Sequence, residues 1–152
     1  MTGASESSPR AFVFGNAAID EVFLVPDLPS AGESVLGRLG HSGLGGKGAN
    51  QAIALARTGV PTTLVAAVGA DRYGRRIGSA LEDEPLDSEL IERPGLPSDR
   101  SIILVQESGS NVIVTTSDCA RSVSSADCRS VLARARATDA VLLQGNLDID
   151  VT

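Results

Sequence analysis

One stretch, residues 42–59, constrains the fold more than any other part of the chain, because it places a glycine-rich segment directly before a helix-forming one. Four glycines fall within residues 43–48, and alanine and isoleucine then recur at helical spacing until a glycine and a proline end the pattern. A glycine-rich loop can present its backbone N–H groups to an oxygen-rich ligand at a helix N-terminus. Lys47 and Asn50 are the polar side chains expected to point into such a site.

Two nucleotide-binding patterns fit this stretch poorly. A P-loop requires glycine where His41 stands, and Ser or Thr after the lysine, where Gly48 stands. The dinucleotide pattern G-x-G-x-x-G is met by Gly43, Gly45 and Gly48, but a buried apolar strand should run directly into it. Residues 34–40 instead alternate as a half-exposed strand would. A tight turn before an alanine-rich packing helix, with no ligand at all, stays open as an interpretation.

Length and composition indicate one domain with an aliphatic core. The chain has 152 residues, a net charge of −6 and scattered basic residues, which argues against nucleic acid or a membrane as partner. Residues 1–10 are small and polar, without the apolar segment of a secretory signal, and are predicted to be a disordered lead-in. Cys119 and Cys128 match no metal or redox motif, and Cys128 lies on the apolar face of a predicted helix, so we expect it to be a buried thiol. We also expect no metal site and a reducing, cytoplasmic location.

Strand and helix patterns alternate along the chain, which predicts a mostly parallel, three-layer α/β sheet. Residues 11–15 are predicted to form a buried strand, and residues 16–20 follow at its carboxyl end, where open α/β sheets bind ligands. Asp20 could therefore bind two hydroxyl groups, or be an ordinary turn aspartate. The other predicted elements are strands at 33–42, 64–69 and 86–92, a helix at 74–82, a hairpin of 101–106 and 111–116, a helix capped by Ser124, and a buried strand at 140–145.

Residues 45–52, Gly-Gly-Lys-Gly-Ala-Asn-Gln-Ala, closely resemble the first signature of the ribokinase-like (PfkB-type) carbohydrate kinases. Residues 32–33, 68–74 and 142–144 follow the same family in order and spacing. The resemblance runs from about Phe12 to the C-terminus and implies that residues 11–152 form the N-terminal half of a ribokinase-like domain. It also implies a small β lid made by about 33–42 and 100–116, which in this family often pairs between subunits and so predicts a homodimer.

The resemblance implies a sugar-binding site at Asp20, Gly45, Gly46, Lys47, Asn50 and Asn146. The chain departs from the family at two places: Ala18 stands where ribokinases usually carry Asn, and Asn146 stands where many carry a sugar-binding Glu. The preferred acceptor is therefore not fixed as ribose, and other sugars or a nucleoside stay open.

The family's D-T-x-G-A-G-D motif, which carries the catalytic aspartate beside an anion hole, is missing from these 152 residues. The resemblance implies ATP and Mg²⁺ for the full-length family member, with no catalytic, nucleotide or metal residue in this chain. We therefore expect the substrate-binding half of an ATP-dependent sugar kinase that is inactive alone. The alternatives are a non-catalytic sugar-binding or regulatory module, or one half of a split kinase. A parallel sheet that stops midway should also leave an unpaired edge and favour association.

Overall fold

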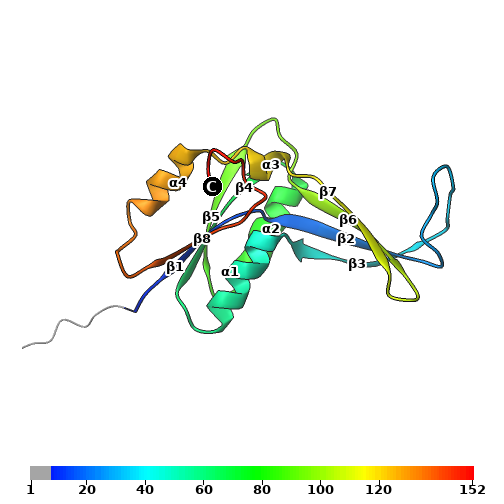
Figure 1. Cartoon of the computed structure of the whole chain (residues 1–152), viewed down its shortest axis with the longest axis horizontal. Coiled ribbons are helices and arrows are strands. Elements are labelled where there is room, and N and C mark those ends of the chain that lie inside the picture. Colours follow the sequence, from blue (N-terminus) through cyan, green and yellow to red (C-terminus); the bar gives the residue numbers. More distant parts are fainter. Residues whose placement is uncertain (1–7) are drawn as a thin grey trace, which may run out of the picture.

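Two four-stranded sheets organise the computed structural model, which describes residues 8–152 (Figure 1). The elements in chain order are β1 (Ala11–Phe14), β2 (Ala18–Val25), β3 (Arg38–Gly45), α1 (Lys47–Arg57), β4 (Thr62–Gly69), α2 (Arg72–Glu82), β5 (Asp87–Arg93), β6 (Arg100–Gln106), β7 (Asn111–Thr115), α3 (Asp118–Arg121), α4 (Ser125–Leu132) and β8 (Ala140–Leu143).

The first sheet is parallel throughout, in the order β5-β4-β1-β8. Because successive side chains of a strand point to opposite faces, β1 contributes to two cores. Val13 packs in the core beneath α1 and α2, whereas Phe12 and Phe14 pack in the core beneath α3 and α4. The sheet therefore lies between two helical layers, which confirms the predicted three-layer α/β fold.

The second sheet, in the order β3-β2-β6-β7, extends away from the first and forms the predicted lid (Figure 1). Its strand β2 was missed by the sequence analysis, which ended the first strand before residues 16–20 and saw no strand between them and the connector. β3 also begins and ends later than the predicted strand at 33–42. Both errors have one cause: β2 is held by β3 on one side and β6 on the other, and these are long-range partners.

The glycine-rich segment is mostly strand instead of loop. Gly43 and Gly45 lie within β3, and Gly46 is the glycine there that adopts a positive φ, at 96°. α1 begins immediately afterwards and ends as predicted, with Gly59 at a φ of 89° just beyond the last turn. The predicted flexible loop is thus reduced to one sharp junction between β3 and α1.

Asp71, which follows β4 of the first sheet, forms hydrogen bonds with Ser98, which precedes β6 of the lid. Its carboxylate caps α2 by accepting from the backbone N–H of Gly74 at 2.8 Å, and it also accepts from the Ser98 backbone N–H at 2.9 Å and the Ser98 hydroxyl at 2.7 Å. Partial burial tends to raise the pKa of Asp71, but these hydrogen bonds outweigh it and lower the pKa. This part of the 68–74 motif therefore has a structural role.

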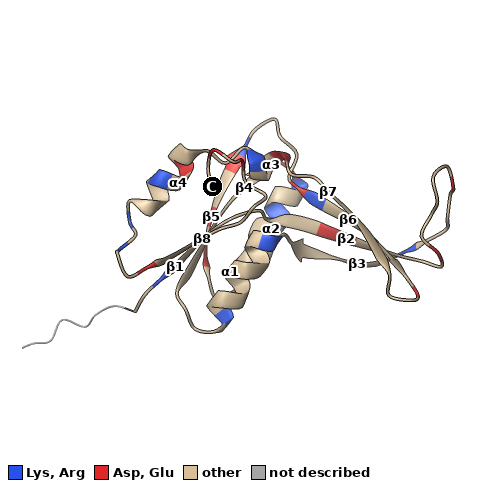
Figure 2. Ribbon diagram, in the orientation of Figure 1, with Lys and Arg blue, Asp and Glu red and all other residues tan. Residues whose placement is uncertain are grey.

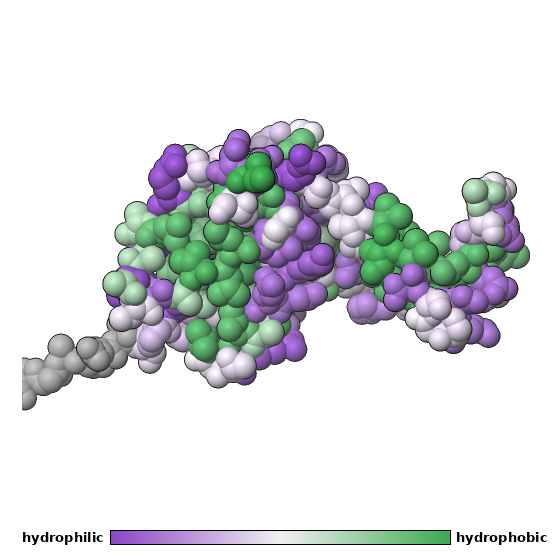
Figure 3. All heavy atoms as spheres, viewed as in Figure 1, coloured by the Kyte–Doolittle hydropathy of each residue, from purple (hydrophilic) through white to green (hydrophobic). Residues whose placement is uncertain are grey.

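The strand β8 is half exposed, although the sequence predicted a buried strand. Val141 is 45 % exposed and Leu143 44 % exposed, because β8 pairs with β1 on one edge and with no other described strand. Hydrophobic residues also gather on the outer part of the second sheet, where Val112, Ile113 and Val114 of β7 are exposed (Figure 3). Association through either surface, including a homodimer through the lid, stays a prediction.

Asp139 fastens β8 beside β1. One carboxylate oxygen accepts from the Arg10 backbone N–H at 2.9 Å, and the other accepts from the Arg10 guanidinium at 2.8 Å. Arg136 also donates to Asp139 and forms an ion pair with it. Arg10 is the last residue of the predicted lead-in and is thus anchored, while residues 1–7 of that lead-in lie outside the described part. Hydrogen bonds from Arg136 and then Arg10 lower the pKa of the Asp139 carboxyl strongly.

We expect Asp139 to make the chain acid-labile. Its pKa is lower folded than unfolded, so its stabilisation is complete above the unfolded value of about 4 and is lost as the pH falls below it. Urea unfolding between pH 7 and pH 3 should show Asp139→Asn less stable than wild type at pH 7, with the difference shrinking as the pH falls. A difference that does not change with pH would contradict this assignment.

Candidate functional site

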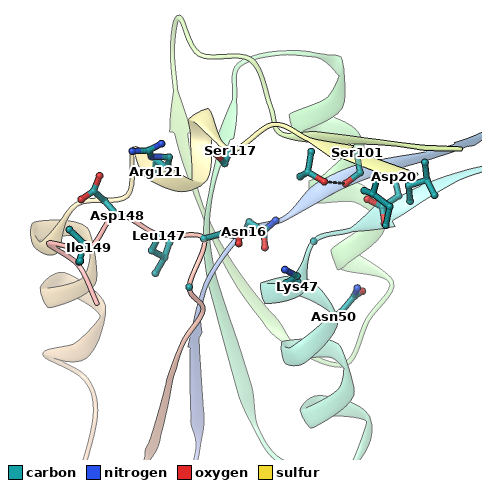
Figure 4. A pocket seen from close by; sticks show the side chains of 16 residues that line it. Asn16, Asp20, Lys47, Asn50, Ser101, Ser117, Arg121, Leu147, Asp148 and Ile149 are labelled. Carbon is teal, nitrogen blue, oxygen red and sulfur yellow. Dashed lines mark hydrogen bonds between the residues drawn. The ribbon is translucent and has the colours of Figure 1, made fainter. Parts of the chain in front are cut away.

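A cavity of about 730 Å³ lies where the first sheet meets the lid, at the carboxyl ends of β1 and β8 (Figure 4). Five of the six predicted site residues line it, and the sixth, Gly45, lies directly behind it in β3. The lining residues are Asn16, Asp20, Gly46, Lys47, Asn50, Ser101, Ile103, Ile113, Thr115, Ser117, Arg121, Gly145, Asn146, Leu147, Asp148 and Ile149. The structure therefore brings segments more than 100 residues apart into one hollow.

The predicted polar side chains reach this cavity from three different elements. Asp20 comes from the start of β2, Lys47 and Asn50 from the first turn of α1, and Asn146 from the segment after β8. Within residues 8–152, the side chains of these four residues form no hydrogen bond or ion pair with the protein. Their donors and acceptors are therefore available to a ligand.

Gly45 makes room for the carboxylate of Asp20. In the antiparallel pairing of β2 and β3, Gly45 lies opposite Ala18, two positions along the strand from Asp20. A Cβ atom on Gly45 would lie 2.2 Å from the Asp20 Cγ atom, so any side chain there would push the carboxylate out of its position. Gly45 is thus a positioning residue for Asp20.

The N-terminus of α1 is not open to a ligand in the way the sequence suggested. Asn16 accepts hydrogen bonds from two backbone N–H groups in the first turn of α1. Its Oδ1 accepts from the Gly48 N–H at 3.2 Å, and its backbone carbonyl accepts from the Ala49 N–H at 3.0 Å. Gly46, at the N-cap position, has no side chain that could cap the helix. The absence of a capping residue there was the signal that another part of the chain must supply one.

Several lining residues were not predicted from the sequence. Ser101 and Thr115 come from neighbouring lid strands, and the Thr115 hydroxyl donates to the Ser101 hydroxyl oxygen at 3.1 Å (Figure 4). Arg121 comes from α3, a four-residue helix that the sequence analysis missed, and Asp148 from the last segment of the chain. No local sequence pattern marks these residues, because the register of the lid strands and the path after β8 bring them to the cavity.

Metal-ligating side chains do not cluster among the described residues. Within residues 8–152, no group of three or more His, Cys, Asp or Glu side chains is arranged to hold a metal. Lys and Arg residues are spread over several elements (Figure 2). His41 is exposed on β3.

Neither cysteine is suited to act as a nucleophile. Cys119 and Cys128 are both buried and free, and burial was predicted for Cys128. Burial raises the pKa of the Cys119 thiol to about 11, and the thiol donates a hydrogen bond to the Pro97 carbonyl at 3.1 Å. Burial likewise raises the pKa of Cys128. Among residues 8–152, no helix is both long and apolar enough to span a membrane.

A parallel sheet with helices on both faces, a β lid and a polar cavity at the strand ends define an α/β protein whose cavity lies where such sheets commonly bind ligands. The family model for pfkB family carbohydrate kinases matches residues 8–148. The chain therefore belongs to the pfkB family of carbohydrate kinases, in agreement with the resemblance of residues 45–52.

Ribokinases are among the relatives and solved structures most similar to the chain. It is 33 % identical to the ribokinase of Bacillus subtilis over 132 residues, which cover 87 % of this chain and 45 % of that protein. It is 30 % identical to the mouse ribokinase, covering 86 % of this chain and 42 % of the relative. The structure of the Giardia lamblia ribokinase superimposes with a TM-score of 0.83 at 28 % identity, over 95 % of this chain and 44 % of that one.

The ribokinase of Arabidopsis thaliana, whose structure was solved in complex with ribose and ATP, superimposes with a TM-score of 0.69 at 28 % identity. The match covers 95 % of this chain and 49 % of that one. The chain thus spans about half the length of the curated relatives and solved structures that it matches.

Proposed function

We propose that this chain is the acceptor-binding half of an ATP-dependent sugar kinase. The observation that carries the proposal is the convergence of four unpartnered polar side chains on one cavity. A carboxylate such as Asp20 can accept hydrogen bonds from two neighbouring hydroxyl groups, whereas Lys47 donates. The amides of Asn50 and Asn146 can do both. The ribose bound by the Arabidopsis relative supports a sugar as the ligand class.

The lid gives the cavity its second wall in this proposal. Ser101, Ile103, Ile113 and Thr115 reach it from β6 and β7. A lid that closes over an acceptor excludes water, which suppresses hydrolysis of ATP and strengthens electrostatic contacts. The buried free cysteines fit a reducing, cytoplasmic compartment.

Transfer of the phosphoryl group needs groups that this half does not offer. The attacking hydroxyl needs a base or positioning residue, and the phosphoryl oxygens need donors and Mg²⁺. We assign these to the other half of the family fold, which would supply the catalytic aspartate and hold ATP. A non-catalytic sugar-binding or regulatory module is the second candidate. A second open reading frame downstream that carries D-T-x-G-A-G-D would favour a split or interrupted kinase over such a module.

The purified 152-residue chain should bind at least one sugar without releasing ADP from ATP. Isothermal titration calorimetry with pentoses, hexoses and nucleosides measures binding, and a coupled ADP-release assay over the same panel measures transfer. ADP release at kinase-like rates would refute the assignment of transfer to the other half. A chain that is folded by circular dichroism yet binds no member of the panel would refute the proposed function.

A further inference from the structure

Arg121 is a cation in the cavity that has no partner in the described chain. It is the last residue of α3, its side chain is exposed, and it lines the same hollow as Asp20. Within residues 8–152 its guanidinium forms no hydrogen bond or ion pair. Most other arginines do have such partners: Arg10, Arg57, Arg93, Arg100, Arg134 and Arg136 are each paired with a carboxylate.

Within residues 8–152, no acidic group of the cavity forms an ion pair with Arg121. Figure 4 shows Arg121 and Asp148 on the side of the cavity away from Asp20 and Ser101. Asp148 forms no ion pair with Arg121, and its carboxylate instead accepts from the Asp150 backbone N–H at 3.2 Å. Asn146, on the same segment as Asp148, is a neutral amide where the family resemblance would place a glutamate. On this side of the cavity, the Arg121 guanidinium therefore has no ion-pair partner within residues 8–152, and position 146 carries no negative charge.

We propose that Arg121 recognises an anionic group on the acceptor, so that the acceptor is a sugar acid or a sugar phosphate. This inference rests on the proposed function, in which Asp20 binds the sugar hydroxyls. A guanidinium presents several donors in a planar fork that matches carboxylate and phosphate oxygens. At about 730 Å³, the cavity has room for a monosaccharide with such an added group. A neutral pentose would leave Arg121 without a role.

Matched sugar pairs test the inference directly. Calorimetry on the 152-residue chain would compare D-gluconate with D-glucitol, and D-fructose 6-phosphate with D-fructose. At least one anionic member should bind about tenfold or more tightly than its neutral partner, the size expected for one charge-assisted hydrogen bond. The pair that shows the preference identifies the group as carboxylate or phosphate. Arg121→Gln should remove the preference, and Arg121→Lys should retain part of it because it keeps the charge.

Arg129→Gln is the matched control, because it removes the same charge from α4 at a residue that does not line the cavity. It should leave the preference unchanged. The inference is overturned if the neutral sugars bind as tightly as the anionic ones and Arg121→Gln changes neither affinity, while Asp20→Asn still weakens binding. That result would leave the proposed function standing. The inference would also be overturned if inorganic phosphate bound as tightly as the sugar phosphate, because the site would then bind an anion without recognising the sugar. If none of these four compounds binds but a neutral member of the pentose, hexose and nucleoside panel does, the inference is overturned and the proposed function stands. If no member of the panel binds either, both are refuted.

Discussion

Replacing Gly48 by alanine is expected to cost about 3 kcal/mol or more of folding free energy, at the upper end of overpacking effects. A Cβ atom there would lie 2.7 Å from the Asn16 nitrogen and 2.7 Å from two backbone atoms of Gly15. These neighbours belong to the chain that leaves β1, so they cannot yield as a flexible side chain would. The same shift would break the bonds by which Asn16 caps α1. Urea unfolding followed by circular dichroism measures the loss.

Gly78→Ala is the matched control for this prediction. Gly78 lies inside α2, and the Cβ atom there would meet its nearest neighbour, Leu90 Cδ1, at an ordinary contact distance of 3.5 Å. Alanine is favoured over glycine inside a helix by about 0.5–1 kcal/mol. The same substitution should therefore stabilise the chain at position 78 and destabilise it at position 48. Equal effects at the two positions would contradict the close approach of β1 and α1.

Asp20→Asn is expected to weaken sugar binding by about a hundredfold, because two hydrogen bonds to a charged acceptor are weakened or lost at about 1.5–3 kcal/mol each. Folding stability should change little, because Asp20 has no partner within the described chain. Calorimetry with the tightest-binding sugar of the panel and urea unfolding give the two readouts. An unchanged sugar affinity would show that the cavity does not bind its ligand through Asp20.

Two further variants separate the effect of the Asp20 carboxylate's position from the effect of its charge. Glu21→Gln removes the same charge at the neighbouring residue, which pairs with Arg100 and does not line the cavity, so sugar affinity should be kept. Gly45→Ala keeps the Asp20 residue and its charge but displaces its carboxylate. The affinity for sugar should therefore fall toward that of the Asp20→Asn variant. If Gly45→Ala bound sugar as wild type does, the positioning role of Gly45 would be wrong.

Local patterns were enough to predict the parallel sheet and most of its helices. The buried apolar run at residues 64–69, the helical pattern at 74–82 and the Ser124 cap need no knowledge of distant partners, and all three agree with the structure. The glycine-rich octet at 45–52 identified the family because its spacing is unusual. The octet was also expected to present its backbone N–H groups to a ligand, but Asn16, about 30 residues earlier, accepts hydrogen bonds from two of them.

The sequence alone therefore determined the family, the layered fold and five residues of the cavity lining, since each depends on residue types at short spacing. Only the tertiary structure decided the strand Ala18–Val25, the exposed edge of β8 and the place of Arg121. The physical reason is that strand pairing and cavity lining arise between segments far apart in the chain. The strand Ala18–Val25 is stabilised by hydrogen bonds to two distant strands, and the cavity around Arg121 is formed by residues of other elements. Neither arrangement produces a periodic pattern in the local sequence.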